Sequence, residues 1–300
     1  MVDANTTAAM MEELRQAGLV VDDLILDGEI QRVGTTKKPK GTDGRYGGHA
    51  DRPANLWWEN FHDGTKGKWS AKTDKPLTPA EKEAFKARMV ADKAKREAEE
   101  ALRHKEGAEE AQRLYTAATP CTGHEYLTKK GVNPVPFLKV GTDSFGNQNA
   151  LIVPLFNEAK EITTLQSIPD AQGGKLFLPG GKKKGSFFPI GGKDVEKSLL
   201  VCEGLATGLS LYEAVGFPVL VAFDAGNLLS VAEVARRLYP EREIVLCADY
   251  DDPSKGYPAP GGIGVAKATE AAVAVGGSVA IPRHEFPPES AAFLSGLCRG

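Results

Sequence analysis

The sequence predicts an α/β protein with a parallel sheet in its last third. Three short apolar runs, residues 198–202, 219–223 and 244–248, alternate with two amphipathic stretches, residues 205–215 and 229–239. Runs of about five apolar residues separated by helical patterns are typical of βαβ units, whose helices cover both faces of the sheet. We therefore expect strands that are buried on both faces.

The composition is that of an ordinary globular protein. The chain has 300 residues and a net charge of −3, so any nucleic-acid contact must use a local basic surface. Its four cysteines form no CxxC pair, which argues against a zinc ribbon and a disulfide framework. We expect Cys202 and Cys247, inside predicted strands, to act as small hydrophobic residues. No signal peptide or long apolar run is visible, so we expect a cytoplasmic protein without membrane contact.

Residues 1–77 are expected to form a small basic and aromatic α+β unit. A helix is predicted over residues 8–17, and strands over 20–26 and 30–33 flank an Asp-Gly turn. The Gly- and Lys-rich stretch 35–54 is too polar for a core and is predicted to be a loop.

All three tryptophans lie in a basic window of this unit. Residues 31–75 hold ten Lys/Arg against five Asp/Glu, and residues 56–61 and 68–70 are predicted to form an antiparallel pair. Cations that contact phosphates and rings that stack on bases suit single-stranded nucleic acid. The alternative, which we favour for at least two of the three rings, is that the tryptophans form the core of the unit.

A long charged helix is predicted to link this unit to the rest, over residues 78–118. Thr78-Pro79-Ala80-Glu81 is a capping box with Pro at the first helical position. No apolar heptad is sustained, so we favour a spacer or a loosely packed arm over a coiled-coil dimer. Gly107 is expected to weaken the helix.

Residues 119–197 are expected to form a β-rich subdomain. A buried strand over residues 150–155 should pair with the alternating residues 161–168. From residue 172 to 197 there are six lysines against two acids, and glycines there permit close backbone approach. Since lysine neutralises phosphate, we interpret four lysines as contacts for nucleotide or nucleic acid, with a solvated hairpin as the alternative. These lysines are Lys175, Lys182, Lys183 and Lys184.

Each of the three apolar runs ends in an acid. Glu203, Asp224 and Asp249 follow the runs directly, and Asp251 and Asp252 lie just beyond. Because sites in open α/β sheets lie outside the carboxyl ends of the strands, several carboxylates should converge on one edge. Such oxygen ligands favour Mg²⁺ or Mn²⁺ over zinc, and these ions handle phosphates. The alternative is an ordinary sheet whose strands end in polar turns.

The pairing of Glu203-Gly204 with a later Asp249-Tyr250-Asp251 resembles the Toprim domain of primases and topoisomerases. The two motifs lie about 45 residues apart, on predicted strand ends. Residues 203–207, EGLAT, are similar to the EGYAT motif of plasmid and phage primases, with Leu in place of Tyr. Residues 124–131 are similar to the "HxYLxxKG" opening of the same family. The resemblance covers about residues 120–282.

This resemblance implies a Toprim fold, a Rossmann-like parallel sheet with flanking helices, over residues 198–300. It implies a DNA primase that makes short RNA primers on single-stranded DNA from NTPs, with Mg²⁺ or Mn²⁺. Glu203 would be the general acid/base or a metal ligand, and Asp249 and Asp251 metal ligands. Asp252 offers a third carboxylate, while Asp224 is expected in a structural turn, with metal or substrate contact as the alternative.

The segment after Asp252 continues the pattern with a Pro/Gly-rich loop, a helix over residues 263–274 and a strand over 278–281. Lys267, in the first half of that helix, either faces a phosphate or is solvated. Related primases have a further acidic segment in the tail, where only Glu285 and Glu289 are present here.

The sequence contains no GxxxxGK[ST] motif, so we expect no P-loop helicase here, and a replicative helicase would act in trans. Two rival functions remain at this point. One is a Toprim nuclease, and the other is a catalytically inactive DNA-binding accessory protein of replication.

Overall fold

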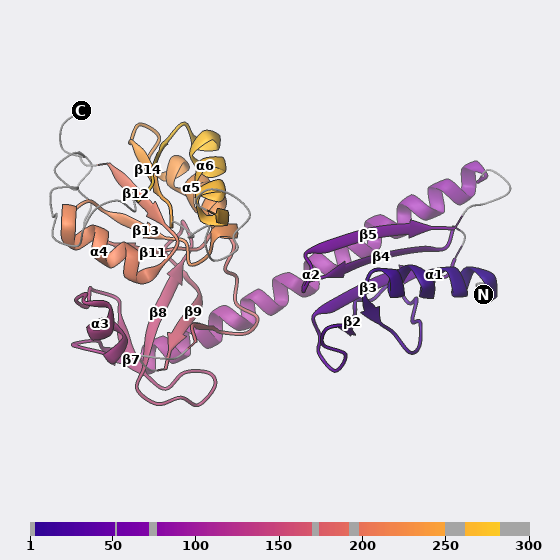
Figure 1. The fold of residues 1–300 in the computed structure, drawn as a ribbon, viewed down its shortest axis with the longest axis horizontal. Helices are drawn as coiled ribbons and strands as arrows, with labels where there is room; N and C mark the ends of the chain where they lie inside the picture. Colours follow the sequence, from indigo (N-terminus) through magenta and orange to yellow (C-terminus); the bar gives the residue numbers. More distant parts are fainter. Residues whose placement is uncertain are drawn as a thin grey trace. The chain divides into compact units, whose positions relative to one another are not determined.

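The chain folds into two compact units, Met1–Ala98 and Glu99–Gly300, in a computed structural model (Figure 1). The structure describes residues 4–51, 53–71, 77–169, 174–191, 198–249 and 262–282. Helices and sheets occur in both units, which confirms the mixed α/β class. Among the described helices, none combines the length and the apolar character needed to cross a bilayer.

The first unit is an antiparallel sheet of five strands with one short helix. Met10 and Leu14 of the helix pack on Tyr46 and Leu56 of the sheet. Strands follow one another in the order β1-β2-β3-β4-β5. The elements are α1 (Ala4–Gln16), β1 (Leu19–Val20), β2 (Gln31–Thr35), β3 (Gly44–His49), β4 (Asn55–Asn60) and β5 (Thr65–Ser70).

The tryptophans of this unit divide between core and surface. Trp58 and Trp69 pack against the core, which agrees with the interpretation favoured for two of the three rings. The Trp58 indole also donates a hydrogen bond to Glu13 at 3.1 Å. Trp57 instead lies under the Arg45 guanidinium, 5.7 Å from its ring centroid.

The predicted loop over residues 35–54 is wrong, because β3 lies within it. Tyr46, at the centre of β3, is 1% exposed and anchors the strand in the core. Gly47 and Gly48 follow it where neighbouring groups come close: a Cβ on Gly48 would lie 2.2 Å from the Asn55 carbonyl oxygen. Composition favoured a loop, but a strand that is tightly flanked on both sides can use glycine at such positions.

The long helix α2 (Pro79–Ala117) begins with the predicted capping box. The Thr78 hydroxyl accepts from the Glu81 amide at 3.2 Å, and the Glu81 carboxylate accepts from the Thr78 amide at 2.7 Å. The helix runs through Gly107 without a break. Its last turns are packed rather than loose, because Ala111 and Leu114 enter the core of the second unit.

The second unit contains an antiparallel sheet ordered β10-β9-β8-β7-β6. The predicted pairing of its two longest strands, β8 and β9, is confirmed. The "HxYLxxKG" residues form a short helix, α3, that is capped by His124 and by Gly131 in a left-handed conformation. The elements are β6 (Thr119–Pro120), α3 (Glu125–Lys130), β7 (Lys139–Gly141), β8 (Ala150–Phe156), β9 (Ile162–Ile168) and β10 (Leu176–Phe177).

The other sheet of this unit is the predicted parallel one, ordered β11-β13-β12-β14-β15. Four strands are parallel, and β11 adds an antiparallel edge that the sequence did not reveal. The elements are β11 (Phe188–Ile190), β12 (Leu199–Cys202), α4 (Leu205–Val215), β13 (Val219–Val221), the 3₁₀ turn η1 (Ala225–Asn227), α5 (Leu228–Leu238), β14 (Ile244–Cys247), α6 (Gly262–Val275) and β15 (Ser278–Ala280).

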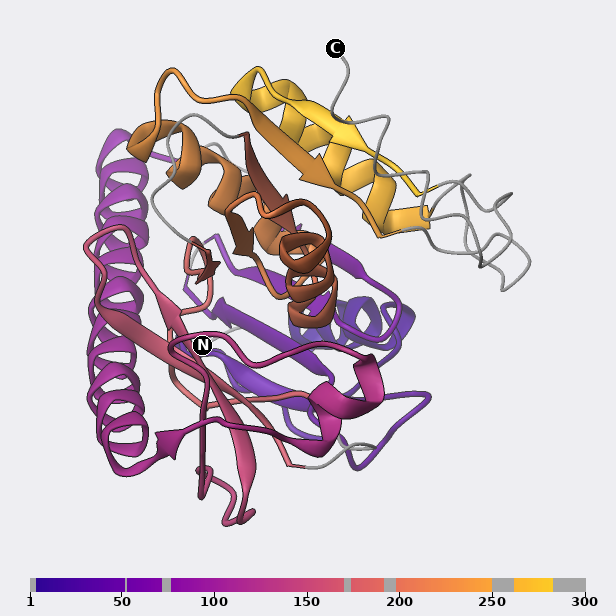
Figure 2. The same cartoon turned by 90° about the vertical axis from the view of Figure 1, so that its left-hand side faces the viewer.

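Helices cover both faces of this sheet, as expected. Leu200 and Cys202 of β12 share a core with Leu209 of α4. Leu199 and Val201 point the other way and pack with α5 and α6. Figure 2 shows α6, in yellow, running alongside the outermost strands. Because the helices connect parallel strands, the carboxyl ends of these strands all lie at the same edge of the sheet.

Candidate active site

Three acids lie along the carboxyl edge of the parallel sheet. Cys202 is level with Val221 in β13 and with Cys247 in β14. Since β12 lies between β13 and β14, the residues just beyond the strands occur in the order Asp224, Glu203, Asp249. Glu203 is therefore central, with one acid on each side.

Thr207 connects the two halves of the predicted acidic motif. Gly204 is the N-cap of α4, so this helix begins directly after Glu203. One turn into the helix, the Thr207 hydroxyl donates to Oδ1 of Asp249 at 3.4 Å. Glu203 and Asp249 are both partly buried. The sequence assigned no role to Thr207, although its place in the EGLAT motif was a usable signal.

Two thiols lie beneath these carboxylates. Burial raises the pKa of Cys202 well above its ordinary value, and the charges of Asp249 and Glu203 act in the same direction. Burial and the charge of Asp249 raise the pKa of Cys247 to about 12. Both side chains are buried, so they stay neutral and serve as core residues, as predicted.

Asp249 is also approached closely by the start of α6. A Cβ on Gly264 would lie 2.5 Å from the Asp249 carbonyl oxygen. Lys267, one turn later, forms a 2.6 Å ion pair with Glu270. In this structure Lys267 thus contacts a carboxylate of its own helix.

The structure describes two members of the predicted metal set, Glu203 and Asp249. Asp251 and Asp252 lie outside the described residues, as do Glu285 and Glu289. Within the described ranges, no group of three metal-ligating side chains comes together. Glu203 and Asp249 are the members of the set that the structure locates, and their oxygens suit a hard divalent cation.

The predicted lysines point to different surroundings. We call residues 182–186, between β10 and β11, the lysine loop. Lys183 forms an ion pair with Asp224, and its ammonium lies 4.8 Å from the centre of the Phe177 ring. Lys182, Lys184 and Lys175 are exposed. The lysine loop therefore brings one of its lysines to the acidic edge.

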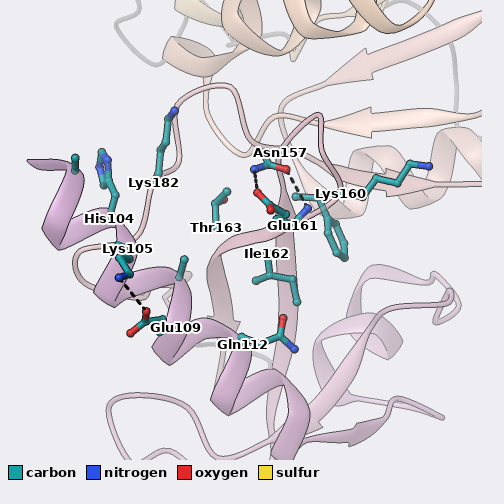
Figure 3. A pocket seen from close by; sticks show the side chains of 13 residues that line it. His104, Lys105, Glu109, Gln112, Asn157, Lys160, Glu161, Ile162, Thr163 and Lys182 are labelled. Carbon is teal, nitrogen blue, oxygen red and sulfur yellow. Dashed lines mark hydrogen bonds and ion pairs between the residues drawn. The ribbon is translucent and has the colours of Figure 1, made fainter.

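Lys182 lines a groove on another side of the loop (Figure 3). The groove measures about 920 Å³ and runs between α2 and the β8–β9 hairpin. Ala101, Ala108 and Ile162 are apolar residues of its lining, and Lys105, which also lines it, forms an ion pair with Glu109 at 4.0 Å. No sequence pattern predicts this groove, because it depends on how the helix packs on the hairpin.

A buried asparagine ties the lysine loop to the sheet. Asn227, 3% exposed, bonds to several backbone groups of the loop. The sequence placed it in a turn without a role. Its one signal was a position after Asp224-Ala225-Gly226, where a polar side chain precedes an amphipathic helix.

The acidic edge lies in a part of the chain that is similar to known proteins. Residues 197–278 match the model of the Toprim domain. Over 280 residues the chain is 33% identical to a DNA primase TraC of Escherichia coli, which covers 90% of this chain and 26% of that protein. A second DNA primase TraC of the same organism is 32% identical over 283 residues, covering 90% of this chain and 19% of the relative. The chain thus spans about a quarter or less of these relatives.

Solved primase structures superpose only loosely. The RNA polymerase domain of Mycobacterium tuberculosis primase DnaG gives a TM-score of 0.34 at 19% identity, over 58% of this chain and 62% of that chain. The Aquifex aeolicus primase, with its zinc binding and RNA polymerase domains, gives 0.39 at 11% identity, over 95% and 79%. The sequence matches carry the comparison: residues 197–278 match the Toprim domain, and the chain is similar over most of its length to part of DNA primase TraC.

Proposed function

We propose that this chain acts as a DNA primase, which makes short RNA primers on single-stranded DNA by metal-dependent nucleotidyl transfer. One observation carries the proposal. Glu203 and Asp249 follow adjacent parallel strands of the matched Toprim domain, and Thr207, in the helix after Glu203, donates a hydrogen bond to the side chain of Asp249. The similarity to TraC supports the same reaction class.

The acids divide the chemistry between them in this proposal. Phosphoryl transfer requires positioning and charge stabilisation more than covalent help from the protein. Asp249, Asp251 and Asp252 would hold Mg²⁺ or Mn²⁺, which supplies charge neutralisation at the reacting phosphate. Glu203, at the centre of the edge, would take the proton of the attacking hydroxyl or complete the metal set.

Basic residues would hold the substrates. We assign phosphate contacts to Lys175, Lys182, Lys183, Lys184 and Lys267. The partners are a single-stranded DNA template and NTPs, with a replicative helicase acting in trans, in the cytoplasm.

The four segments would divide the work along the chain. Residues 119–197 and 198–300 form the primase core in this proposal. Residues 1–77 form a separate basic unit, and residues 78–118 link it to the core.

Primer synthesis on circular single-stranded DNA tests this function. Wild type, Glu203→Gln and Asp249→Asn are compared with labelled NTPs and Mg²⁺ or Mn²⁺. We expect short products from wild type and a loss of roughly 10²–10⁴-fold in both variants. Glu233→Gln, which changes an exposed carboxylate on α5, is the matched control and should keep its activity.

Other outcomes would replace the proposal. Nicked template without products would indicate a nuclease. Intact DNA binding with neither products nor nicks would indicate an accessory binder.

A further inference from the structure

The lysine loop is held by one side chain from the sheet edge. The amide nitrogen of Asn227 donates to the carbonyls of Lys183, Ser186 and Ala222, at 3.2, 3.0 and 2.9 Å. Its amide oxygen accepts from the backbone of Gly185 at 2.8 Å. A buried amide with this many partners fixes the loop backbone, since losing it would leave several buried groups unpaired.

A second contact fixes the direction of one lysine side chain. The Lys183 ammonium is ion-paired to Asp224 and lies over the ring of Phe177. That ring packs edge-on against Phe223, with 6.0 Å between centroids. Lys183 is thus held by a charge and by an aromatic face at once.

The backbone next to the Lys183–Asp224 pair is hydrogen-bonded to Glu203, the candidate catalytic residue. Phe223 precedes Asp224 and adopts a φ of 71°, an uncommon conformation for a residue other than glycine. Its amide donates to the carbonyl of Glu203 at 2.8 Å. Strained backbone that is fixed by its surroundings is often found at functional sites. Asp224 and the cation on it therefore sit next to Glu203, on the side away from Asp249.

We infer that Asp224 and Asn227 are positioning residues, which set Lys183 beside Glu203 to bind a phosphate of the nucleotide or the DNA. This inference rests on the proposed function. Asn227 fixes the loop backbone, and Asp224 orients the ammonium. Asp224 is then a partner of a lysine rather than a metal ligand. Among the lysines of the loop, Lys183 is the one that is held beside Glu203, whereas Lys182 and Lys184 are exposed.

Binding measurements on a mutant cycle test the inference. Wild type, Lys183→Gln, Asp224→Asn and the double variant are titrated with ATP in Mg²⁺ and, separately, with a short labelled single-stranded oligodeoxynucleotide. A tenfold loss is expected for Lys183→Gln, about the value of one charge-assisted contact. The probe that loses affinity identifies the source of the phosphate. Lys130→Gln, an exposed lysine on α3, is the matched control.

Asp224→Asn discriminates positioning from simple charge. If Asp224 orients Lys183, its replacement weakens binding severalfold in wild type and has no further effect once Lys183 is glutamine. The effect persists in the Lys182→Gln and Lys184→Gln backgrounds. Tighter binding by Asp224→Asn would show a mere competing charge and overturn the inference. A loss of affinity that persists in the Lys183→Gln background, together with a higher Mg²⁺ requirement, would indicate that Asp224 is a metal ligand. That result would also overturn the inference.

Asn227→Ala supplies a second line of evidence. It should weaken binding of the same probe by no more than Lys183→Gln does, with no added loss in the double variant. Circular dichroism checks that the sheet remains folded; if it does not, the Lys183–Asp224 cycle alone decides. Unchanged affinity of Lys183→Gln for both probes would overturn the inference. Absence of primer synthesis by wild type would instead contradict the proposed function, and the binding cycle would still be readable.

Discussion

The hydroxyl of Thr207 donates a hydrogen bond to Oδ1 of Asp249, 3.4 Å away, across two strands of one sheet. Thr207 lies one turn into the helix that follows Glu203, and Asp249 follows the neighbouring strand. A single contact therefore ties the first acidic motif to the second. The rigid elements on each side limit how far the two carboxylates can separate.

Removing this hydroxyl should weaken the site without unfolding it. Thr207→Val keeps the shape and loses the donor, so we expect a roughly tenfold fall in primer synthesis at limiting Mg²⁺, the range for a bond to a charged group. Thr207→Ser keeps the donor and should retain most of the activity. Titration of Mg²⁺ against initial rate measures both. Equal losses in the two variants would show that the methyl group, not the bond, matters.

Gly264 should tolerate no side chain. Alanine is a better helix former than glycine by about 1 kcal/mol. Its Cβ would nevertheless lie 2.5 Å from the Asp249 carbonyl oxygen, so either α6 or Asp249 must move. We expect Gly264→Ala to reduce primer synthesis strongly and stability by about 1–3 kcal/mol, measured in parallel by urea unfolding. Gly123→Ala, where nothing lies within 4 Å of the new methyl, is the control. Activity equal to that control would refute the close approach.

At Gly107, inside α2, helix propensity and steric contact again act in opposite directions. A Cβ there would lie 2.7 Å from the backbone of Gly180 and Gly181. Helix propensity alone predicts that Gly107→Ala raises the unfolding temperature, and the steric contact predicts that it lowers it. We expect the contact to dominate, because backbone atoms cannot rotate away. Glu106→Ala, at an exposed neighbouring position, should change the temperature little. A rise for Gly107→Ala would mean that Gly180 and Gly181 do not pack against the helix.

Local sequence patterns predicted much of the fold, but they did not predict contacts between residues that are far apart in the sequence. The three parallel strands and the acid that follows each of them could be predicted from short apolar runs, which any buried strand between helices requires. The strand around Tyr46 was missed because three of its six residues are glycine. The Asn227 bond to the Ser186 carbonyl joins residues 41 positions apart, and no periodicity signals such a bond. Of the predicted metal ligands, Asp249 lies in the part of the chain that the structure describes, and Asp251 lies outside it.

Asp143 should make stability depend on pH. This buried carboxylate accepts hydrogen bonds from the amides of Phe145 and Asn147, from the Asn147 side chain and from the Ser167 hydroxyl, all at 2.9–3.0 Å. Burial alone would raise its pKa, but these bonds outweigh it and hold the pKa below the usual value of 3.8. A group whose pKa falls on folding stabilises the folded state above its unfolded pKa, and this contribution is lost as pH drops through the folded pKa.

Asp143→Asn should remove this contribution. We expect the free energy of unfolding to fall by roughly 1–3 kcal/mol at pH 7, because the amide nitrogen of the asparagine faces hydrogen-bond donors. The difference from wild type should become smaller toward the lowest pH at which the protein stays folded, the acid limit. Urea unfolding from pH 7 down to the acid limit measures the difference, with the exposed Glu241→Gln as control. A difference that stays constant with pH would mean that the carboxylate charge contributes nothing and that the variant acts through packing alone.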